Sequence, residues 1–107
     1  MLSESVKNTI INTIKPMDPD KIILFGSYAY GKPVSESDID LLIIKDIPED
    51  KVRETRIEAK KLLWQEFKNK NISFDVLVDS ENRIKSRIEI GDLFYEEIFN
   101  KGQVIYA

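Results

Sequence analysis

The sequence predicts an α/β (α+β) protein in which a small mixed β-sheet is flanked by helices. Three observations predict it: short Ile-rich apolar runs of strand length, longer segments with apolar residues at helical spacing, and turn residues between them. Along the chain these segments follow the order α-β-β-α-β-α-α-β. The length of 107 residues predicts a single domain over 1–107, because chains divide into several domains only beyond about 250 residues.

Four helices are expected, each from a capping residue or a break in the apolar pattern. Ser3 can cap the first helix, and Pro16 ends it because proline cannot continue a helical backbone. The second is the longest and carries acidic residues near its N-terminus, where they stabilise a helix. The helices begin at Ser3, Pro48, Ser80 and Gly91-Asp92, and end at Pro16, at about Asn69, after Ile88 and at Gly102.

Four apolar runs predict strands at 21–25, 38–45, 72–78 and 103–106, the last as an edge strand. The first two strands are separated only by the segment 26–37, which is close to the lower limit for a parallel crossover. We therefore expect these two strands to pair antiparallel within a mixed sheet.

The absence of histidine and cysteine excludes several kinds of active site, among them Ser-His-Asp relays, thiol nucleophiles, iron–sulfur clusters and the usual zinc sites. Chemistry must then depend on carboxylates, hydroxyls, amines, backbone amides or a metal bound through oxygen. A net charge of -3 without basic runs disfavours direct binding to nucleic acid. No apolar run approaches the roughly 20 residues that span a bilayer, and no signal-like segment follows Met1, so we expect a cytoplasmic protein without membrane attachment.

Three aspartates are the candidate catalytic residues. Side chains alternate along a strand, so Asp38 and Asp40 project from one face with their Cα atoms about 6.6 Å apart. Asp75 interrupts an otherwise apolar strand, where a buried carboxylate needs a partner. If the three carboxylates converge, their repulsion destabilises the fold unless a cation lies among them. Oxygen ligands of this kind suit Mg²⁺ or Mn²⁺, completed by water and substrate phosphate. The sequence therefore predicts a metal centre for phosphoryl chemistry.

Gly26 and Ser27 supply a matching feature for an anion. They end the first strand and lead into an expected helical turn at 28–30, so backbone N–H groups and the Ser27 hydroxyl can face a phosphate. Taken singly, the residues have structural explanations, with Asp38 as a strand-start residue and Asp75 as the partner of a Lys or Arg. The combination of a glycine-serine turn, two acids on the next strand and a third acid on a later strand favours a functional site.

Other residues are expected to serve packing. Tyr28 and Tyr30 are predicted to be partly buried, Lys32 to be solvated, and Trp64 to lie in the core or at an interface. The apolar residues of the C-terminal segment are expected in the core rather than at an interface, namely Leu93, Phe94, Ile98, Val104 and Ile105.

The strings GS at 26–27, YAYGKPVSES directly after it and DID at 38–40 resemble the GS-x10-DxD signature of the DNA polymerase β-type nucleotidyltransferases. The segments KIILFGSYAYG, FDVLV and DLFYEEIFNKGQVIYA extend the resemblance over nearly the whole chain. So short a chain most resembles the minimal nucleotidyltransferase (MNT) family, whose members pair with HEPN-domain proteins as toxin–antitoxin systems. The resemblance implies a nucleotidyltransferase fold of the polymerase β-like palm type.

The resemblance also implies a role for each candidate residue. Asp38 and Asp40 would be the metal ligands, and Gly26 and Ser27 would bind the triphosphate of the nucleotide. Asp75 would be the third carboxylate, in reach of one of two Mg²⁺ ions and of the attacking hydroxyl. The chain departs from many family members at one position, because Tyr30 stands where they carry an Arg, and Lys32 is the candidate substitute for its charge.

The function implied is transfer of a nucleoside monophosphate, AMP from ATP or the equivalent from another nucleoside triphosphate, to a hydroxyl. In the family the acceptor is often a tyrosine of a HEPN-domain protein encoded nearby, which would make this chain an antitoxin. Two alternatives stay open: a non-catalytic antitoxin that binds its partner, and a nucleotidyltransferase for a small hydroxylated acceptor such as an aminoglycoside. The second alternative needs an acceptor pocket that only a homo-oligomer would complete in so short a chain.

Overall fold

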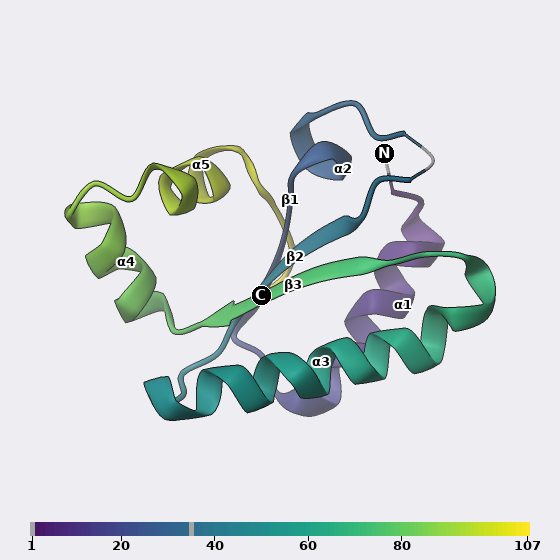
Figure 1. The fold of residues 1–107 in the computed structure, drawn as a ribbon, viewed down its shortest axis with the longest axis horizontal. Coiled ribbons are helices and arrows are strands. Elements are labelled where there is room, and N and C mark those ends of the chain that lie inside the picture. The colour runs from purple at the N-terminus through teal and green to yellow at the C-terminus, as the bar shows by residue number, and fades with distance from the viewer. Residues whose placement is uncertain (1, 35) are drawn as a thin grey trace.

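A four-stranded mixed sheet forms the centre of the structure, a computed structural model that describes residues 2–34 and 36–107. Figure 1 shows the sheet between two groups of helices. The strands are β1 (Lys21–Phe25), β2 (Ile39–Ile44), β3 (Phe74–Asp79) and β4 (Gln103–Tyr106), and the helices are α1 (Glu4–Ile14), α2 (Ser27–Tyr30), α3 (Val52–Phe67), α4 (Glu81–Glu89) and α5 (Leu93–Lys101). The predicted fold class is confirmed.

The strand order is β3-β2-β1-β4, so β3 and β4 are the edges of the sheet. β1 pairs antiparallel with both β2 and β4, which confirms the expected antiparallel pair and the expected C-terminal edge strand. β2 and β3 are parallel, and the chain connects them through α3. This crossover brings the start of β3 next to the start of β2, which positions the candidate site.

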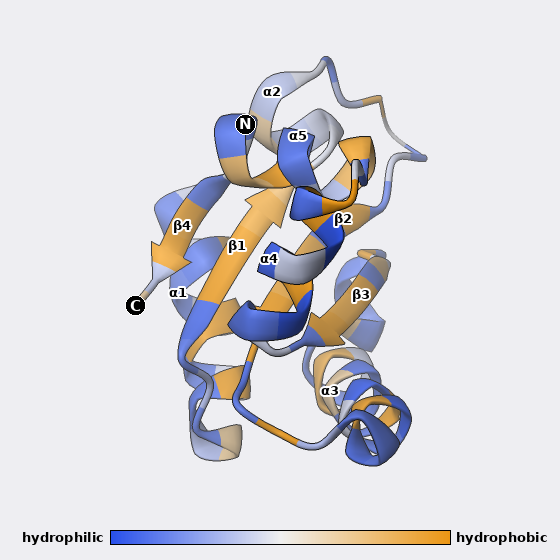
Figure 2. Cartoon of the chain, turned by 90° about the vertical axis from the view of Figure 1, so that its left-hand side faces the viewer, coloured by the Kyte–Doolittle hydropathy of each residue, from blue (hydrophilic) through white to orange (hydrophobic). Residues whose placement is uncertain are grey.

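Each face of the sheet has its own apolar core. Alternate residues of β1 and β2, such as Ile22 and Leu41, pack with α1 and α3, while their neighbours, such as Ile23 and Leu42, pack with α4 and α5. Both central strands are therefore apolar on two faces, and Figure 2 shows β1 in orange along most of its length, after a hydrophilic first residue. One buried residue from each of the last two helices, Ile84 from α4 and Ile98 from α5, completes the smaller core.

Capping contacts confirm three of the predicted helix starts, at Ser3, Ser80 and Asp92. Ser3 Oγ accepts a hydrogen bond from the Val6 N–H at 3.2 Å. Ser80 Oγ accepts from the Arg83 N–H at 3.2 Å, and the Asp92 carboxylate accepts from the first N–H groups of α5. Side chains at these positions satisfy N–H groups that lack a partner inside the helix.

The prediction that the apolar residues of the C-terminal segment lie in the core is partly wrong. Leu93, Phe94 and Val104 are 74%, 51% and 54% exposed, whereas Ile98 is buried. α5 turns Ile98 toward the sheet, with Tyr95 and Phe99 packed against the same core, and this helical phase directs Leu93 outward. Trp64 is also outside the core, at 63% exposed, because the buried face of α3 runs through Ala59, Leu63 and Phe67.

In the part of the chain that the structure describes, we find no helix with both the length and the apolar character needed to cross a membrane.

Candidate functional site

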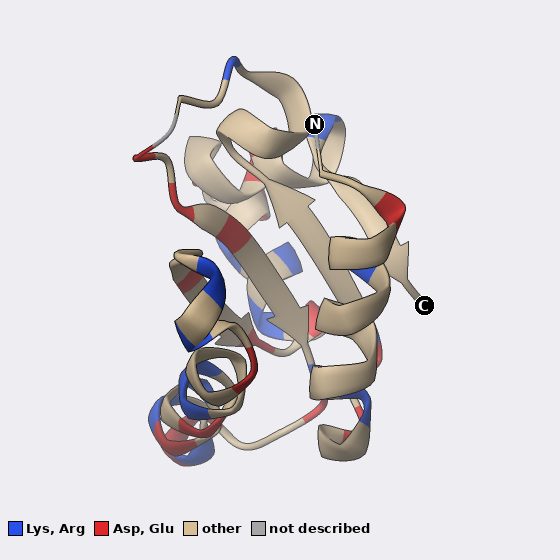
Figure 3. Ribbon diagram, turned by 90° about the vertical axis from the view of Figure 1, so that its right-hand side faces the viewer, with Lys and Arg blue, Asp and Glu red and all other residues tan. Residues whose placement is uncertain are grey.

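The parallel pairing of β2 and β3 brings two of the candidate acids together. Asp40 and Asp75 are register partners, and neighbouring strands lie about 4.8 Å apart, so the two carboxylates project side by side from one face. Asp38 precedes Asp40 by two positions and leads into β2 on the same face. Figure 3, with acidic residues in red, shows acidic positions at the start of β2 and in the loop before it. All three predicted acids thus lie at the end of the sheet where β2 and β3 begin.

Asp40 lies where its negative charge is unfavourable. Partial burial raises the pKa of the Asp40 carboxyl group, and the negative charges of Asp75 and Asp38 raise it further. Its neighbour in the antiparallel direction is Phe25, the last residue of β1, so one side of Asp40 is apolar. The ionised form of Asp40 is therefore disfavoured unless a positive charge approaches it.

Asp75 is exposed, which corrects the expectation of a buried acid inside an apolar strand. The reason is its position near the start of the edge strand β3, where neighbouring strands cover only one side. The alternative that Asp75 forms an ion pair with a Lys or Arg is not observed among the described residues. Its carboxylate is accessible to a molecule that approaches from the β3 edge.

Ser73 is the site residue that we did not predict. Its hydroxyl donates a hydrogen bond to the Asp38 carboxylate, and its carbonyl accepts from the Ile39 N–H at 3.0 Å. Alternation along the strand places Ser73 on the same face as Asp75, and this was the signal available in the sequence. Ser73 therefore fixes the orientation of Asp38 relative to β3.

Gly26 joins the predicted anion-binding turn to the acids. It has a φ of 72°, which favours glycine, and it precedes α2. A Cβ atom at this position would overlap the Asp40 carboxylate. Only a residue without a side chain lets the turn approach Asp40 this closely, so Gly26 and Ser27 lie directly beside the acidic group. α2 then forms the helical turn expected at 28–30, with the Ala29 N–H donating to the Gly26 carbonyl at 3.0 Å.

An aromatic pair forms a wall next to the acids. Phe94, from the first turn of α5, packs edge-on against Phe25 with ring centroids 5.9 Å apart. Since Phe25 is the register partner of Asp40, this contact places the start of α5 close to the site. The exposed part of Phe94 faces outward from this position.

The residues present suit a divalent cation in the way that Mg²⁺ usually binds. In the described part of the chain no group of three or more acidic side chains is already arranged as a metal site. Mg²⁺, however, usually binds through one or two carboxylates together with water and substrate phosphates, rather than within a closed protein cage. The neighbouring pair Asp40 and Asp75 fits that requirement, and a cation between them would relieve the repulsion that raises the pKa of Asp40.

The fold and these side chains together define a class of protein. A strand followed by a glycine-serine turn, beside paired acids on two adjacent strands, is the arrangement of a nucleotidyltransferase. The nucleotidyltransferase domain family matches residues 7–105, and the chain belongs to this family.

Two similar proteins come from Methanocaldococcus jannaschii, and both carry the name "putative protein adenylyltransferase". One is 36% identical over 86 residues, which cover 80% of this chain and 77% of that protein. The other is 32% identical over 93 residues, which cover 86% of this chain and 84% of that protein.

Proposed function

We propose that this nucleotidyltransferase transfers AMP from ATP to the hydroxyl of a tyrosine on a HEPN-domain toxin, and so acts as its antitoxin in the cytoplasm. The observation that carries the proposal is the close approach of the Gly26 turn to Asp40, with Asp75 beside it in register. This arrangement supports the proposal because it brings the glycine-serine turn next to a pair of carboxylates, one of which, that of Asp75, is exposed. The names of the two similar proteins support AMP as the transferred group and a protein as the acceptor.

Gly26 and Ser27 would bind the terminal phosphates of the nucleotide. The backbone N–H groups at the start of α2 and the Ser27 hydroxyl are the donors available there. Because Gly26 lies against Asp40, a triphosphate bound at the turn extends its α-phosphate toward the acids. This positioning orients the reacting phosphorus before the acceptor arrives.

Asp40 and Asp75, together with Asp38, are the residues that would hold Mg²⁺ or Mn²⁺, as one ion or as the pair of ions expected from the sequence. Bound there, the metal would neutralise charge on the entering and leaving oxygens. The remaining chemistry belongs to the chain itself. The acceptor oxygen forms a bond to the α-phosphorus, and the bond from that phosphorus to the bridging oxygen breaks, which releases pyrophosphate. Asp75, exposed on the edge strand, accepts the proton that the hydroxyl loses.

The test is incubation of the purified chain with the HEPN-domain protein encoded beside it, ATP labelled at the α-phosphate, and Mg²⁺. We expect the partner to acquire label and a mass increase of one AMP, and we expect Asp40→Asn to abolish both. The matched control is Asp50→Asn, which removes an exposed acid at the start of the α3 region and leaves transfer unchanged. Absence of label with Mg²⁺ and with Mn²⁺, and with each of the common nucleoside triphosphates, would overturn the proposal.

The non-catalytic antitoxin is the second candidate, and one observation favours it. Three large apolar side chains at the corner between α4 and α5 are exposed, with Ile90 at 87%, Leu93 at 74% and Phe94 at 51%. Exposed apolar residues close in sequence are typical of a surface that contacts another protein. On this hypothesis binding alone neutralises the partner, and loss of the acids has no effect on neutralisation.

A further inference from the structure

The solvent face of α3 carries a one-sided set of side chains. At 100° per residue, six exposed positions fall within about 100° of the helix circumference. They extend over roughly 22 Å, from the first turn of α3 to the residue directly after it. This basic stripe consists of Arg53, Ile57, Lys60, Lys61, Trp64 and Lys68. It contains four cations, two large apolar side chains and no acid.

The cations of the basic stripe are available to a partner. Among the described residues, none of Arg53, Lys60, Lys61 and Lys68 forms an ion pair. Lys68 instead lies over the Trp64 ring, with its Nζ 5.2 Å from the ring centroid. Ile57 and Trp64 are 50% and 63% exposed, two helical turns apart on the same face. Such a combination of free cations and exposed apolar groups, on a chain of net charge -3, indicates a surface that is complementary to an acidic ligand.

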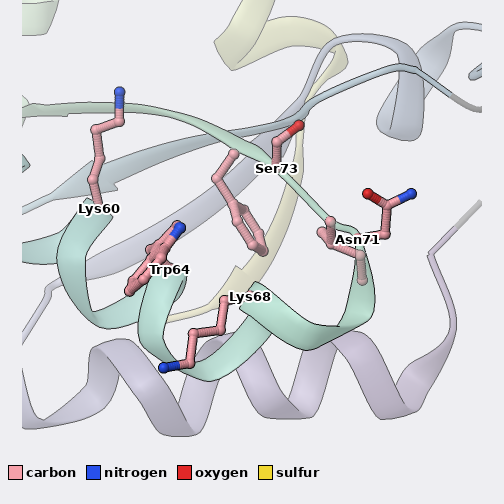
Figure 4. A pocket seen from close by; sticks show the side chains of 7 residues that line it. Lys60, Trp64, Lys68, Asn71 and Ser73 are labelled. Carbon is pink, nitrogen blue, oxygen red and sulfur yellow. The ribbon is translucent and has the colours of Figure 1, made fainter.

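The basic stripe borders a pocket of about 340 Å³ at the C-terminal end of α3. Figure 4 shows Lys60, Trp64 and Lys68 on successive turns of the helix, with Asn71 and Ser73 on the segment that leads into β3. Ser73 is also the residue whose hydroxyl binds Asp38. The pocket and the acidic site thus meet at Ser73, at the start of the edge strand.

The stereochemistry of phosphoryl transfer indicates which reactant, the nucleotide or the acceptor, approaches from the β3 side of the sheet. The attacking and leaving oxygens lie roughly in line through the phosphorus. Gly26, beside which the terminal phosphates would bind, follows β1, whereas Asp75 lies on β3, and β2 with Asp40 lies between them. Pyrophosphate therefore leaves toward the β1 side, and the acceptor hydroxyl enters from the β3 side. Because Asp75 and the pocket both lie near the start of β3, an acceptor that reaches Asp75 over this sheet edge can also contact the pocket.

We propose that the pocket and the basic stripe dock an acidic segment of the acceptor protein, next to the residue that receives the nucleotide. The inference rests on the proposed function, since it assigns the recognition of the protein substrate to this surface. Carboxylates of the segment pair with Lys60 and Lys68, and an apolar side chain of the segment packs on Trp64. A polypeptide fits better than RNA, because the carboxylates at the adjoining site repel a continuous phosphate backbone.

Trp64 is the only tryptophan of the chain, so its fluorescence reports directly on the pocket. The test uses the full chain with Asp40→Asn, in which docking is independent of transfer. The probe is a synthetic peptide with a tyrosine surrounded by glutamates, compared with the same peptide carrying lysines. We expect a saturable change in Trp64 emission with the glutamate peptide only. Lys60→Glu with Lys68→Glu should weaken this binding by about tenfold or more.

The matched control is Lys85→Glu with Lys101→Glu, which makes the same change of charge on α4 and α5, at side chains that are 60% and 61% exposed. These substitutions should leave the affinity for the glutamate peptide unchanged, and thermal unfolding of both double variants verifies their folding. No saturable change, equal binding of the lysine peptide, or equal loss in the control would overturn the inference. A Lys60- and Lys68-dependent response to Mg²⁺-ATP or to an RNA oligonucleotide, with none to the peptide, would also overturn it and assign the pocket to a nucleotide or to RNA.

A second measurement separates this inference from the proposed function. With wild-type acids, the Lys60→Glu and Lys68→Glu double variant should raise the KM for the partner protein, with little change in kcat or in the KM for ATP. Peptide binding without any transfer would contradict the proposed function alone. Transfer that proceeds with an unchanged KM for the partner would contradict the docking surface alone.

Discussion

The close approach of Gly26 to Asp40 determines how near the glycine-serine turn lies to the acids. Substitution of two glycines, Gly26 and Gly91, tests this approach. Gly26 and Gly91 both have positive φ, but a Cβ at Gly91 meets open space, whereas a Cβ at Gly26 meets the Asp40 carboxylate. Gly91→Ala should lower the free energy of unfolding by about 1 kcal/mol, through backbone strain alone. Gly26→Ala should lower it by about 2–4 kcal/mol, because overpacking is added to the same strain.

Urea unfolding of the two variants measures the difference. If the clash with Asp40 is the cause, adding Asp40→Ala to Gly26→Ala should recover stability until only the strain remains. Equal losses in the two glycine variants, or no recovery in the double variant, would contradict the close approach. Nucleotide affinity should fall with Gly26→Ala and stay unchanged with Gly91→Ala.

The raised pKa of Asp40 predicts a pH-dependent cost to stability. Burial and the charges of Asp75 and Asp38 make the folded state hold the Asp40 proton more tightly than the unfolded state does. As the pH rises from the pKa of Asp40 in the unfolded state through its higher pKa in the folded state, the free energy of unfolding therefore falls. The loss of stability persists at neutral pH. Without divalent ions, Asp40→Asn should raise the unfolding temperature at pH 7 and leave it unchanged at about pH 3, below the ordinary Asp pKa.

Scanning calorimetry in EDTA and then in Mg²⁺ tests both parts of this argument. Mg²⁺ should raise the Tm of the native chain, because a cation offsets the repulsion, and should have little effect on Asp40→Asn. Asp50→Asn, at an exposed position, serves as the control: its Tm in EDTA should equal that of the native chain, and Mg²⁺ should raise it by the same amount. A lower Tm for Asp40→Asn at pH 7 in EDTA would show that the carboxylate is not destabilised in the folded state.

At the scale of elements, Arg83 links α4 to the end of β3 and to the segment that follows β2. Arg83 Nε donates to Asp79 at the end of β3, and Arg83 Nη2 donates to the Ile47 carbonyl after β2, each at 2.6 Å. The Asp79 carboxylate also accepts a hydrogen bond from the Ser80 N–H at 2.8 Å. The Arg83–Asp79 pair thus joins β3, the N-terminus of α4 and the segment that follows β2.

Arg83→Met should lower the free energy of unfolding by about 1–3 kcal/mol, because it removes charge-assisted hydrogen bonds and leaves Asp79 partly unpaired. Lys85→Met on the same helix is the control, since Lys85 is 60% exposed and makes only a surface ion pair with Glu81. That substitution should change stability by less than about 1 kcal/mol. Chemical denaturation distinguishes the two, and similar losses would indicate that α4 is held by its apolar face alone.

The elements themselves were predictable because their signals are local. Ser3, Ser80 and Asp92 act as caps where the sequence placed them, and the Ile-rich runs became the central strands. What the sequence did not determine depends on long-range register and helical phase. The pairing of Asp40 with Asp75 needs the crossover through α3, and the exposure of Leu93 depends on which side of α5 meets the sheet.

The contacts within the candidate site were the least predictable part. The overlap between a Gly26 side chain and Asp40 follows from the antiparallel register of β1 and β2, which no local pattern specifies. Likewise, Ser73 meets Asp38 only because two segments 35 positions apart begin adjacent strands. The spacing of residue types identified the acids, and the tertiary structure determined how they are arranged.

At the scale of the whole molecule, the candidate site lies between two surfaces of different character. The apolar corner with Ile90 and Leu93 lies on the α4 and α5 side of the sheet, and the basic stripe lies on the α3 side. The acids at the start of β2 and β3 are on the face toward α4 and α5, and Ser73 connects them with the pocket beside the basic stripe. A protein partner that reaches Asp75 can therefore contact both the apolar corner and the basic stripe.

This arrangement allows catalysis and binding to be separated in the intact protein. Asp38→Ala with Asp40→Ala removes carboxylates from the exposed end of the sheet and leaves the apolar corner and the basic stripe unchanged. If neutralisation of the toxin depends on transfer, cells that carry this double variant with the partner should cease to grow, although calorimetry still detects a complex of the two purified proteins. If masking of the partner is sufficient, growth should equal that with the native chain.

The companion variant Lys60→Glu with Lys68→Glu keeps the acids, so a catalytic antitoxin with a weakened acceptor site should neutralise at high expression and fail at low expression. Full neutralisation by the Asp38→Ala, Asp40→Ala variant at every expression level would exclude the enzymatic mechanism of protection.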